Sequence, residues 1–368
     1  MNELVFGWRT ALLLVVCAQL IIAACLLWMR RFDVVANRVL AGLLFLVAFT
    51  LAPQIIGFAG FYDAFPWLSF APFQNELLIG PLILAYAWAL TSGRVPKAVW
   101  LLMLPGAFDF LYQGFWFLQP FETRWDRIGA FHSEIYAPLK TAIAIGLTVL
   151  GLAGAGRAYL QHRQFMRDHS SAAAEFDPRW LPTFLAICSV TLAAWTIVEV
   201  LNRVLAPQDY YGVYLFHVLV ALSFWGIGQA ALVMQSGAFP KRLRSAPVSD
   251  PAQPERDWAL EAQTLRDRIL AAGWHLEPRL SSPELARRVG TNETYLSRTV
   301  NQGAGANFNR FINEIRVDEV KRKLLTDGPD VLAIALDSGF NSKATFNRVF
   351  KDISGETPAA LRTRLRSG

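Results

Sequence analysis

The sequence predicts an all-α protein: a polytopic transmembrane helix bundle of about seven spans, followed by a smaller domain of short helices. Hydrophobic residues make up 54% of the 368 residues and charged residues only 17%, whereas soluble proteins carry about 25% charged residues. The charges are also uneven, because residues 1–240 hold 14 Lys/Arg and 13 Asp/Glu, and residues 241–368 hold 21 and 16. A nearly neutral apolar region therefore precedes a short basic one, and a basic region favours an anionic partner.

Seven apolar segments follow one another in the first region. They cover residues 10–29, 39–60, 74–91, 98–118, 136–156, 181–202 and 212–234, and about 20 residues suffice to cross a bilayer. Pro53, Pro81 and Pro105 interrupt the second, third and fourth segments, which membrane helices tolerate, so six or eight spans remain open. The first segment ends in two arginines and has no small-residue cleavage site, which predicts a retained span.

The positions of Lys and Arg predict the orientation of this bundle. Twelve lie after the first, third, fifth and seventh segments, and five lie on the opposite side (Arg30, Arg31, Arg38, Arg94, Lys97, Arg157, Arg163, Arg167, Arg179, Lys241, Arg242 and Arg244 against Arg9, Arg124, Arg127, Lys140 and Arg203). Basic residues favour the cytoplasmic side. We therefore expect a multi-pass protein of the bacterial inner membrane with its N-terminus outside and its C-terminal domain in the cytoplasm.

Three ionisable residues lie deep in the apolar segments: Asp109, Glu199 and His217. Charges at membrane depth are costly and mark functional cavities, so we predict that these residues line a sensing site. The alternative is that such residues lie near headgroups or hold helices together; another candidate site is the outer loop 119–135. This half has no metal-ligand spacing, nucleophile motif or phosphate loop, so we expect no metal, no cofactor and no enzymatic activity.

Residues 241–256 read KRLRSAPVSDPAQPER. Three prolines, mixed charge and no apolar period predict a flexible linker. The sequence thus divides into a transmembrane domain, residues 1–240, for which we expect a sensing role, this linker, and a C-terminal domain, residues 257–368.

From Asp257 onward the apolar residues recur with the period of amphipathic helices. Ser282, followed by Pro and Glu, is expected to cap a short helix that ends at Gly290. A second helix, ETYLSRTVNQ, follows a cap at Thr291 or Asn292. A short helix, a glycine turn and a second helix form the helix-turn-helix pattern, in which the second helix enters the major groove.

The same pattern occurs again after a longer helix predicted over 308–325. A helix containing Val331 and Ile334 precedes a turn at Gly339, and a cap at Asn341 or Ser342 begins the second helix. Gly355 ends it, and Thr357-Pro358 begins a last helix. The C-terminal domain is therefore predicted to contain a tandem helix-turn-helix.

These residues resemble a known family. SSPELARRVGTNETYLSRTVNQ, NFNRFINEIRVDEVKRKLL and VLAIALDSGFNSKATFNRVFKDISGETPAALR, within residues 281–364, are similar to the DNA-binding domain of AraC/XylS-family regulators. The last stretch keeps the family's GF…F.R.FK…G.TP…R skeleton. Family members usually carry a soluble sensor domain, so the apolar half departs from the pattern and resembles, in layout, the family's seven-span regulators.

The resemblance implies double-stranded promoter DNA as a partner. Family contacts to bases or phosphates fall on one set of positions here (Thr294, Ser297 and Arg298 in the first unit; Lys343, Thr345 and Arg348 in the second), with further phosphate contacts at Asn292, Ser342 and Lys351. The family often has an aromatic residue at Val300 and a basic residue at Asn301. The first recognition helix, with Glu293 and only one basic residue, Arg298, is also electrostatically weak, so we expect the second unit to bind DNA more strongly.

The favoured function is a membrane-tethered, sequence-specific transcriptional regulator that responds to a signal sensed by the membrane domain. Its partners would be promoter DNA, membrane lipid and an unidentified signal or ligand; a homodimer is an open possibility. Two alternatives remain: a membrane enzyme or transporter with an autoregulatory DNA-binding domain, and a passive membrane anchor for DNA.

Overall fold

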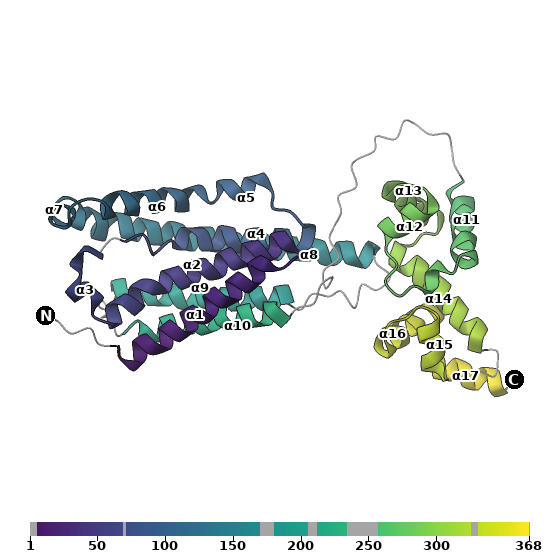
Figure 1. Ribbon diagram of the computed structural model, residues 1–368. Coiled ribbons are helices and arrows are strands. Elements are labelled where there is room, and N and C mark those ends of the chain that lie inside the picture. The colour runs from purple at the N-terminus through teal and green to yellow at the C-terminus, as the bar shows by residue number, and fades with distance from the viewer. Residues whose placement is uncertain are drawn as a thin grey trace. The chain divides into compact units, whose positions relative to one another are not determined.

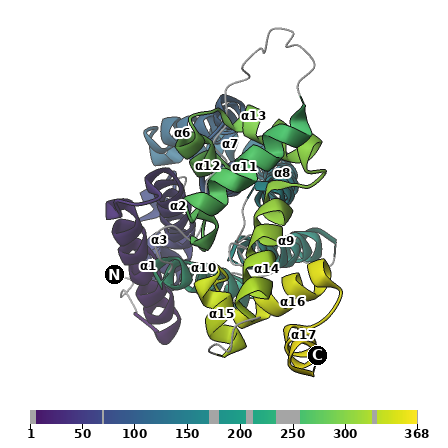
Figure 2. The same ribbon diagram turned by 90° about the vertical axis from the view of Figure 1, so that its right-hand side faces the viewer.

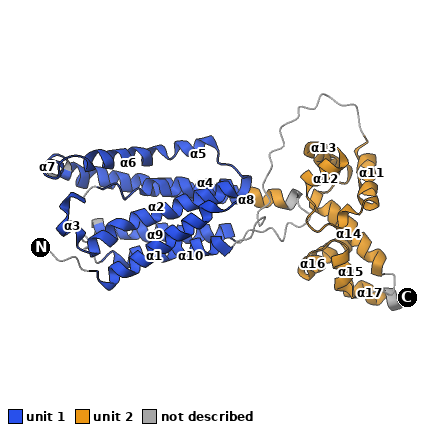
Figure 3. Cartoon of the chain, viewed as in Figure 1, with its two compact units in different colours: residues 1–160, 178–242 blue, residues 161–177, 243–368 orange. Residues whose placement is uncertain are grey.

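The computed structural model describes residues 6–68, 71–169, 180–204, 212–233, 257–324 and 330–367, which are helical throughout apart from turns and one isolated bridge residue. Two compact units divide the chain (Figure 3). Unit 1 contains residues 1–160 and 178–242, and unit 2 contains residues 161–177 and 243–368. The predicted linker, 241–256, lies outside the described residues.

Unit 1 is a bundle of long apolar helices that run side by side (Figure 1). Its main helices are α1 Trp8–Met29, α2 Val34–Phe58, α4 Ile79–Ser92, α5 Lys97–Leu101, α6 Leu104–Phe117, α9 Trp180–Val204 and α10 Tyr214–Val233, with α8 Ala137–His169 up to residue 160. The short elements between them are α3 Phe61–Ala64, η1 Pro66–Leu68, η2 Glu76–Leu78, α7 Phe121–Phe131 and a π-helical turn, η3 His132–Tyr136.

Six of these helical stretches are long and apolar enough to cross a membrane: Trp8–Met29, Val34–Phe58, Lys97–Phe117, Gly129–Met166, Trp180–Asn202 and Tyr214–Val233. A seventh apolar stretch, Glu76–Ser92, is shorter. The seven stretches correspond to the seven predicted segments. Their outward faces carry exposed large apolar side chains such as Ile22, Phe108 and Leu150, a distribution that suits contact with lipid acyl chains.

The three prolines within the apolar segments have different positions in the helices. Pro53 lies inside α2, which continues past it, whereas Pro81 and Pro105 lie in the first turns of α4 and α6. Proline is well accommodated in a first turn because its missing N–H would have no partner there. Of these three prolines, only Pro53 therefore lies in the interior of a helix.

Glycines allow α4 and α8 to approach closely. A Cβ atom on Gly151 of α8 would overlap the carbonyl oxygen of Gly80 on α4, and one on Gly154 would overlap Leu84. Close backbone approach through small residues is typical of membrane helix packing. This contact brings the start of α8 beside η2 and α4, where polar side chains meet.

Unit 2 is built around one helix, α14 Phe308–Leu324. The elements before it are α11 Trp258–Ala271, η4 Trp274–Leu276, α12 Ser282–Val289, α13 Glu293–Arg298 and a π-helical turn, η5 Thr299–Gly303. The elements after it are α15 Val331–Asp337, α16 Lys343–Ser354 and α17 Pro358–Ser367. In both views of the ribbon, α14 lies between the two groups (Figures 1 and 2).

Two small hydrophobic cores share α14. Its first half supplies Phe308, Phe311, Ile312 and Ile315 to a core with α11, α12 and α13. Its second half supplies Val317, Val320 and Leu324 to a core with α15, α16 and α17. Each half of α14 thus supports one helix-turn-helix.

Candidate functional site

The second helix-turn-helix has a well-defined recognition helix, α16. Gly339 makes the turn at φ 90°, and Ser342 caps α16 by accepting the backbone N–H of Thr345 at 3.3 Å, one of the two predicted caps. Phe346 and Phe350 are buried against the core. This packing fixes which face of α16 points outward.

The outward face of α16 is basic. Lys343, Arg348 and Lys351 are exposed, and none of the three forms an ion pair within the part of the chain that the structure describes. Thr345 is half-buried beside them. Arginine and threonine at such positions can contact base edges, and lysine can contact phosphates.

The first helix-turn-helix has a shorter recognition helix. Gly290 ends α12 at φ 79°, and Asn292 caps α13 by accepting the backbone N–H of Tyr295 at 2.7 Å. The expected cap at Ser282 is wrong: Ser281 occupies the cap position, Ser282 is buried in the first turn, and no side chain caps α12. The side-chain oxygens of Asn292 and Ser342 each accept a backbone N–H of the helix that they begin.

The outward face of α13 carries few charges. Leu296 and Val300 are buried, Thr294 and Ser297 are half-buried, and Arg298 is exposed. Ser297 accepts a hydrogen bond from Asn301 at 3.1 Å. After Arg298 the helix widens into the π-helical turn η5, where Gly303 packs so closely on α11 that a Cβ would overlap the carbonyl oxygen of Trp258.

Arg316 lies at the boundary between the two cores of unit 2. Its side chain is 1% exposed, and its guanidinium donates to the carbonyl oxygens of His275 at 2.8 Å and Glu277 at 2.7 Å. Gly339, with φ 90°, lies so near that a Cβ would overlap the His275 carbonyl oxygen. Arg316 therefore ties α14 to η4 beside the turn of the second unit.

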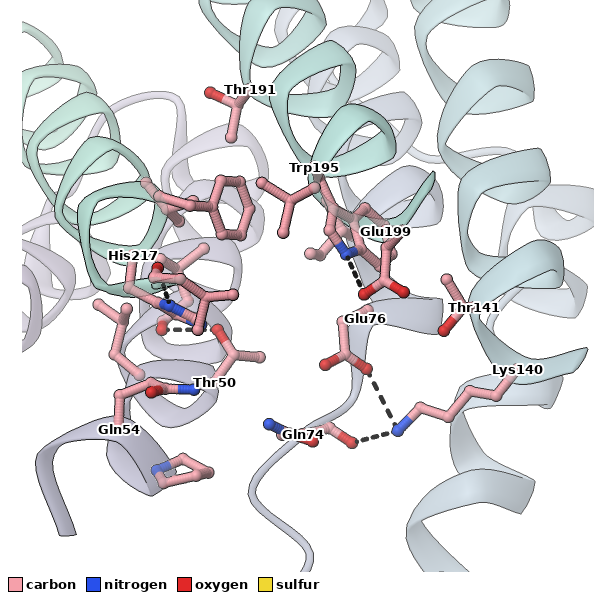
Figure 4. A pocket seen from close by; sticks show the side chains of 18 of the residues that line it. Thr50, Gln54, Gln74, Glu76, Lys140, Thr141, Thr191, Trp195, Glu199 and His217 are labelled. Atoms are coloured by element: carbon pink, nitrogen blue, oxygen red, sulfur yellow. Dashed lines mark hydrogen bonds and ion pairs between the residues drawn. The ribbon is translucent and has the colours of Figure 1, made fainter. Parts of the chain in front are cut away.

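Unit 1 contains a cavity of about 750 Å³. Its walls come from α2, η2, α4, α6, η3, α8, α9 and α10, and Figure 4 shows polar side chains facing its interior. Two of the predicted sensing residues, Glu199 and His217, line it. Trp195 donates to Glu199 at 3.3 Å, and Nδ1 of His217 lies 2.9 Å from the carbonyl oxygen of Val213.

The third predicted sensing residue, Asp109, is fully buried and lies behind the cavity wall. Its carboxylate accepts hydrogen bonds from Tyr136 and Gln113, both at 2.7 Å, and pairs with Lys140 at 3.0 Å. Lys140 itself lines the cavity and also contacts Glu76. Asp109 therefore positions Lys140. Its location within an apolar segment of the sequence did not indicate this role.

The loop 119–135, the other candidate site, forms α7 and most of η3. Arg124 is 4% exposed and donates to the carbonyl oxygens of Phe117, Gln119 and Trp67 at 2.7, 2.7 and 3.0 Å. These bonds fasten the end of α6 to the segment after α3. His132 of this loop also lines the cavity.

A family model described as a helix-turn-helix domain matches residues 285–364, 80 of the 368 residues. The model is of the AraC type, so the C-terminal region of this chain carries an AraC-type helix-turn-helix domain. The matched range begins in α12 and ends in α17, and contains both helix-turn-helix units.

Curated relatives align with about a quarter of this chain. An uncharacterized HTH-type transcriptional regulator of Staphylococcus aureus strain COL is 35% identical over 88 residues, 24% of this chain and 12% of the relative. Right origin-binding protein of Escherichia coli K12 is 29% identical over 102 residues, 28% of this chain and 35% of the relative. A solved structure of a protein of unknown function from Listeria innocua is 30% identical, covering 27% of this chain and 93% of that one with a TM-score of 0.25.

Proposed function

We propose that this chain is a membrane-tethered, sequence-specific transcriptional regulator whose membrane domain senses a signal. The observation that supports it most is the joining, in one chain, of an AraC-type helix-turn-helix domain to six helices long and apolar enough to cross a membrane. The bundle would hold the DNA-binding domain at the inner face of the cytoplasmic membrane, where basic loops favour the cytoplasm.

In this proposal double-stranded promoter DNA is bound mainly by α16. Lys343, Thr345 and Arg348 would meet base edges or nearby phosphates, and Lys351 would meet phosphate. Thr294, Ser297 and Arg298 of α13 would contact a second segment. Asn292 and Ser342 cap the two helices, so the free backbone N–H groups at each helix start would meet the flanking phosphates.

The bundle would act as a receptor with no chemistry of its own. The cavity lined by Glu199 and His217 is the site that we assign to the signal, because it combines polar walls with a volume within the ~300–1,000 Å³ typical of ligand pockets. A ligand that binds one arrangement of the bundle better than another would shift the equilibrium between them. The DNA-binding domain would respond through the chain that connects it.

A promoter-reporter assay tests this function. Cells carrying the full chain should respond to added metabolite extracts, and cells carrying the chain without residues 1–240 should not. Arg348→Ala in the full chain should abolish regulation with or without extract. A full chain that regulates the promoter yet ignores every extract would favour the passive anchor, and a bundle that transforms a compound in the extract would favour the membrane enzyme.

Reporter fusions test the membrane topology separately. A cytoplasmic reporter after Gly237 should be active, and the same reporter within 121–134 should be inactive. Equal signals at the two positions would contradict the proposed orientation and the seven-span count.

A further inference from the structure

The wall of the cavity in unit 1 changes from polar to apolar along two of its helices, α2 and α10. The lining residues of these helices fall into a polar set, Thr50, Gln54 and His217, and an apolar set, Val47, Leu51, Val220 and Phe224. The rings of Phe58 and Tyr214, 5.1 Å apart between centroids, place the end of α2 beside the start of α10. The two helices therefore present their polar residues at the same end of the cavity and their apolar residues beyond it.

Gln54 has a buried amide that the protein does not use. The side chain lines the cavity and is 7% exposed, and its oxygen has no hydrogen-bond partner. Within the part of the chain that the structure describes, its nitrogen has no partner either. A primary amide has two donors and one acceptor, and buried polar groups without partners are rare and call for an explanation. A ligand in the cavity would supply the missing partners.

Two acceptors accompany this amide. Thr50 lies one turn before Gln54, on the same face of α2, and its hydroxyl donates to the carbonyl oxygen of Val47 at 2.8 Å, so its own oxygen can still accept. Nδ1 of His217 lies 2.9 Å from the carbonyl oxygen of Val213, which requires the proton on Nδ1. In the neutral ring, Nε2 is then an acceptor.

These three side chains form the uncharged side of the cavity. Figure 4 shows Thr50, Gln54 and His217 across the cavity from Lys140. Lys140 contacts the carboxylate of Glu76 at 3.2 Å, and this ion pair lies within the bundle. A charged group in apolar surroundings needs an opposite charge beside it, so a head group that faces Gln54 has to be neutral.

The hydrogen-bonding pattern of the amide narrows the class further. An ammonium group donates and does not accept, so it would leave the amide nitrogen without a partner; a carboxylate accepts and does not donate, so it would leave the amide oxygen without one. A hydroxyl or a carboxamide does both. Thr50 and His217 add acceptors for the hydrogen that such a group donates.

We propose that this cavity binds an uncharged amphiphile whose head group is a hydroxyl or a carboxamide. The head group would both accept from and donate to the amide of Gln54, and the apolar body would extend past Val47 and Val220 toward Phe224. The binding site itself is independent of the proposed function; its role as the signal site rests on that function.

Four compounds with the same apolar body test the class: 4-phenylbutanol, its methyl ether, 4-phenylbutylamine and 4-phenylbutyrate. Each is titrated calorimetrically into the full chain in phosphatidylcholine nanodiscs, and partition into empty nanodiscs is subtracted. The alcohol should bind saturably and about fivefold or more tighter than the ether, which cannot donate a hydrogen bond. The amine and the acid should bind more weakly than the alcohol. Equal affinity for alcohol and ether, or tighter binding of either charged compound, overturns the proposal.

Two variants of the same kind locate the site. Gln54→Leu should lower the affinity for the alcohol to that for the ether and leave the ether unchanged. Gln19→Leu is the matched control, because Gln19 is exposed on α1 and does not line the cavity; it should keep the wild-type preference. A preference for the alcohol that persists in Gln54→Leu would contradict the site.

Thermal unfolding of the same samples without ligand tests the unused amide directly. Burying an amide without hydrogen bonds is unfavourable, so Gln54→Leu should unfold at the wild-type temperature or above it. This result would also show that the variant is folded. A lower unfolding temperature would mean that the amide has a partner inside the protein, which contradicts the proposal.

The reporter assay separates this proposal from the proposed function. Binding of the alcohol in nanodiscs with no change in reporter output would leave the site in place and contradict its sensing role. A reporter that responds to extracts, together with equal binding of alcohol and ether in nanodiscs, would contradict the ligand class and leave the sensing role standing.

Discussion

The two helix-turn-helix units of the C-terminal region have the same plan but differ in the helix that faces DNA. In the second, α16 has 12 residues and three exposed cations without an ion pair in the described chain. In the first, α13 has six residues, begins with Glu293 and continues into a π-helical turn. Because phosphate contacts provide much of the affinity for DNA, we expect the second unit to make the stronger contact with DNA and the first unit the weaker one.

The two units can contact DNA at the same time only if they are held at a fixed spacing. Arg316 lies between the two cores on α14. Its substitution should therefore have the largest effect on how the two units are held together.

Arg316→Met should destabilise the C-terminal region by roughly 2–5 kcal/mol, because the carbonyl oxygens of His275 and Glu277 would lose their buried donor. Arg322→Met on the same helix is the matched control: Arg322 is exposed and pairs only with Glu319 in the described chain, so its loss should cost under about 1 kcal/mol. Denaturant unfolding measures both. Equal effects would show that Arg316 does not hold the units together.

Arg348→Ala should reduce discrimination between the target and a mutated site by about 1–3 kcal/mol, the value of a bidentate arginine–guanine contact. Arg298→Ala should reduce it less, because α13 makes the weaker contact. Binding to a target and a scrambled duplex, titrated at one salt concentration, measures the difference. A larger effect at Arg298 would reverse the comparison between the units.

Five base pairs inserted between the two contacted DNA segments should weaken binding about tenfold, since half a helical turn moves one segment to the opposite face. The 17 residues of α14 span about 26 Å at 1.5 Å per residue, and this rigid spacer cannot follow the displaced segment. Footprinting should show two protected segments on the native site. Protection of one segment, or unchanged affinity after the insertion, would mean that only the second unit binds.

Lys351→Ala should weaken binding to all sequences alike and reduce the slope of log affinity against log salt by about 0.9, the value for one phosphate contact. Its effect at a single salt concentration should be smaller than that of Arg348→Ala. Titrations at several salt concentrations measure it. A change that depends on the DNA sequence would assign Lys351 to a base instead.

Glu319→Gln should have the smallest effect, on stability rather than binding. Hydrogen bonding to Arg322 lowers the pKa of the Glu319 carboxyl below its usual value. A lowered folded-state pKa stabilises the fold above the unfolded-state pKa of about 4.3 and loses this contribution as pH falls. The variant should therefore be less stable than wild type by about 0.5 kcal/mol at pH 7 and equal to it near pH 2, and unfolding curves at both pH values show this.

Local sequence patterns predicted most of the helices because each depends on nearby residues. Apolar runs of about 20 residues located the long apolar helices of unit 1, and glycine and cap residues located the turns around α16. The π-helical turn η5 could not be predicted, because it depends on Gly303 packing against α11, some 40 residues earlier. The extension of α8 to His169 was also missed, because its charged residues after Gly156 ended the apolar run.

The polar residues of the bundle show the same limit. Depth in an apolar segment identified Asp109, Glu199 and His217 as unusual, and two of them line the cavity. The sequence could not show that Asp109 would instead be enclosed by Tyr136, Gln113 and Lys140, because that depends on how α6 and α8 pack. Helix packing decides which polar side chains come together. The periodicity of the sequence does not contain this information.

The ion pair between Asp109 and Lys140 has a consequence for how the protein is made. Asp109 lies on the stretch Lys97–Phe117, which has the lowest mean hydropathy of the six candidate spans, and a single charged residue at the centre of a span costs about 2.5–3.5 kcal/mol on insertion. Its partner is synthesised 31 residues later, at the start of α8. In the proposed membrane topology, the α6 segment should therefore leave the translocon stably only together with α8, so that these two helices enter the bilayer as a hairpin with the loop between them.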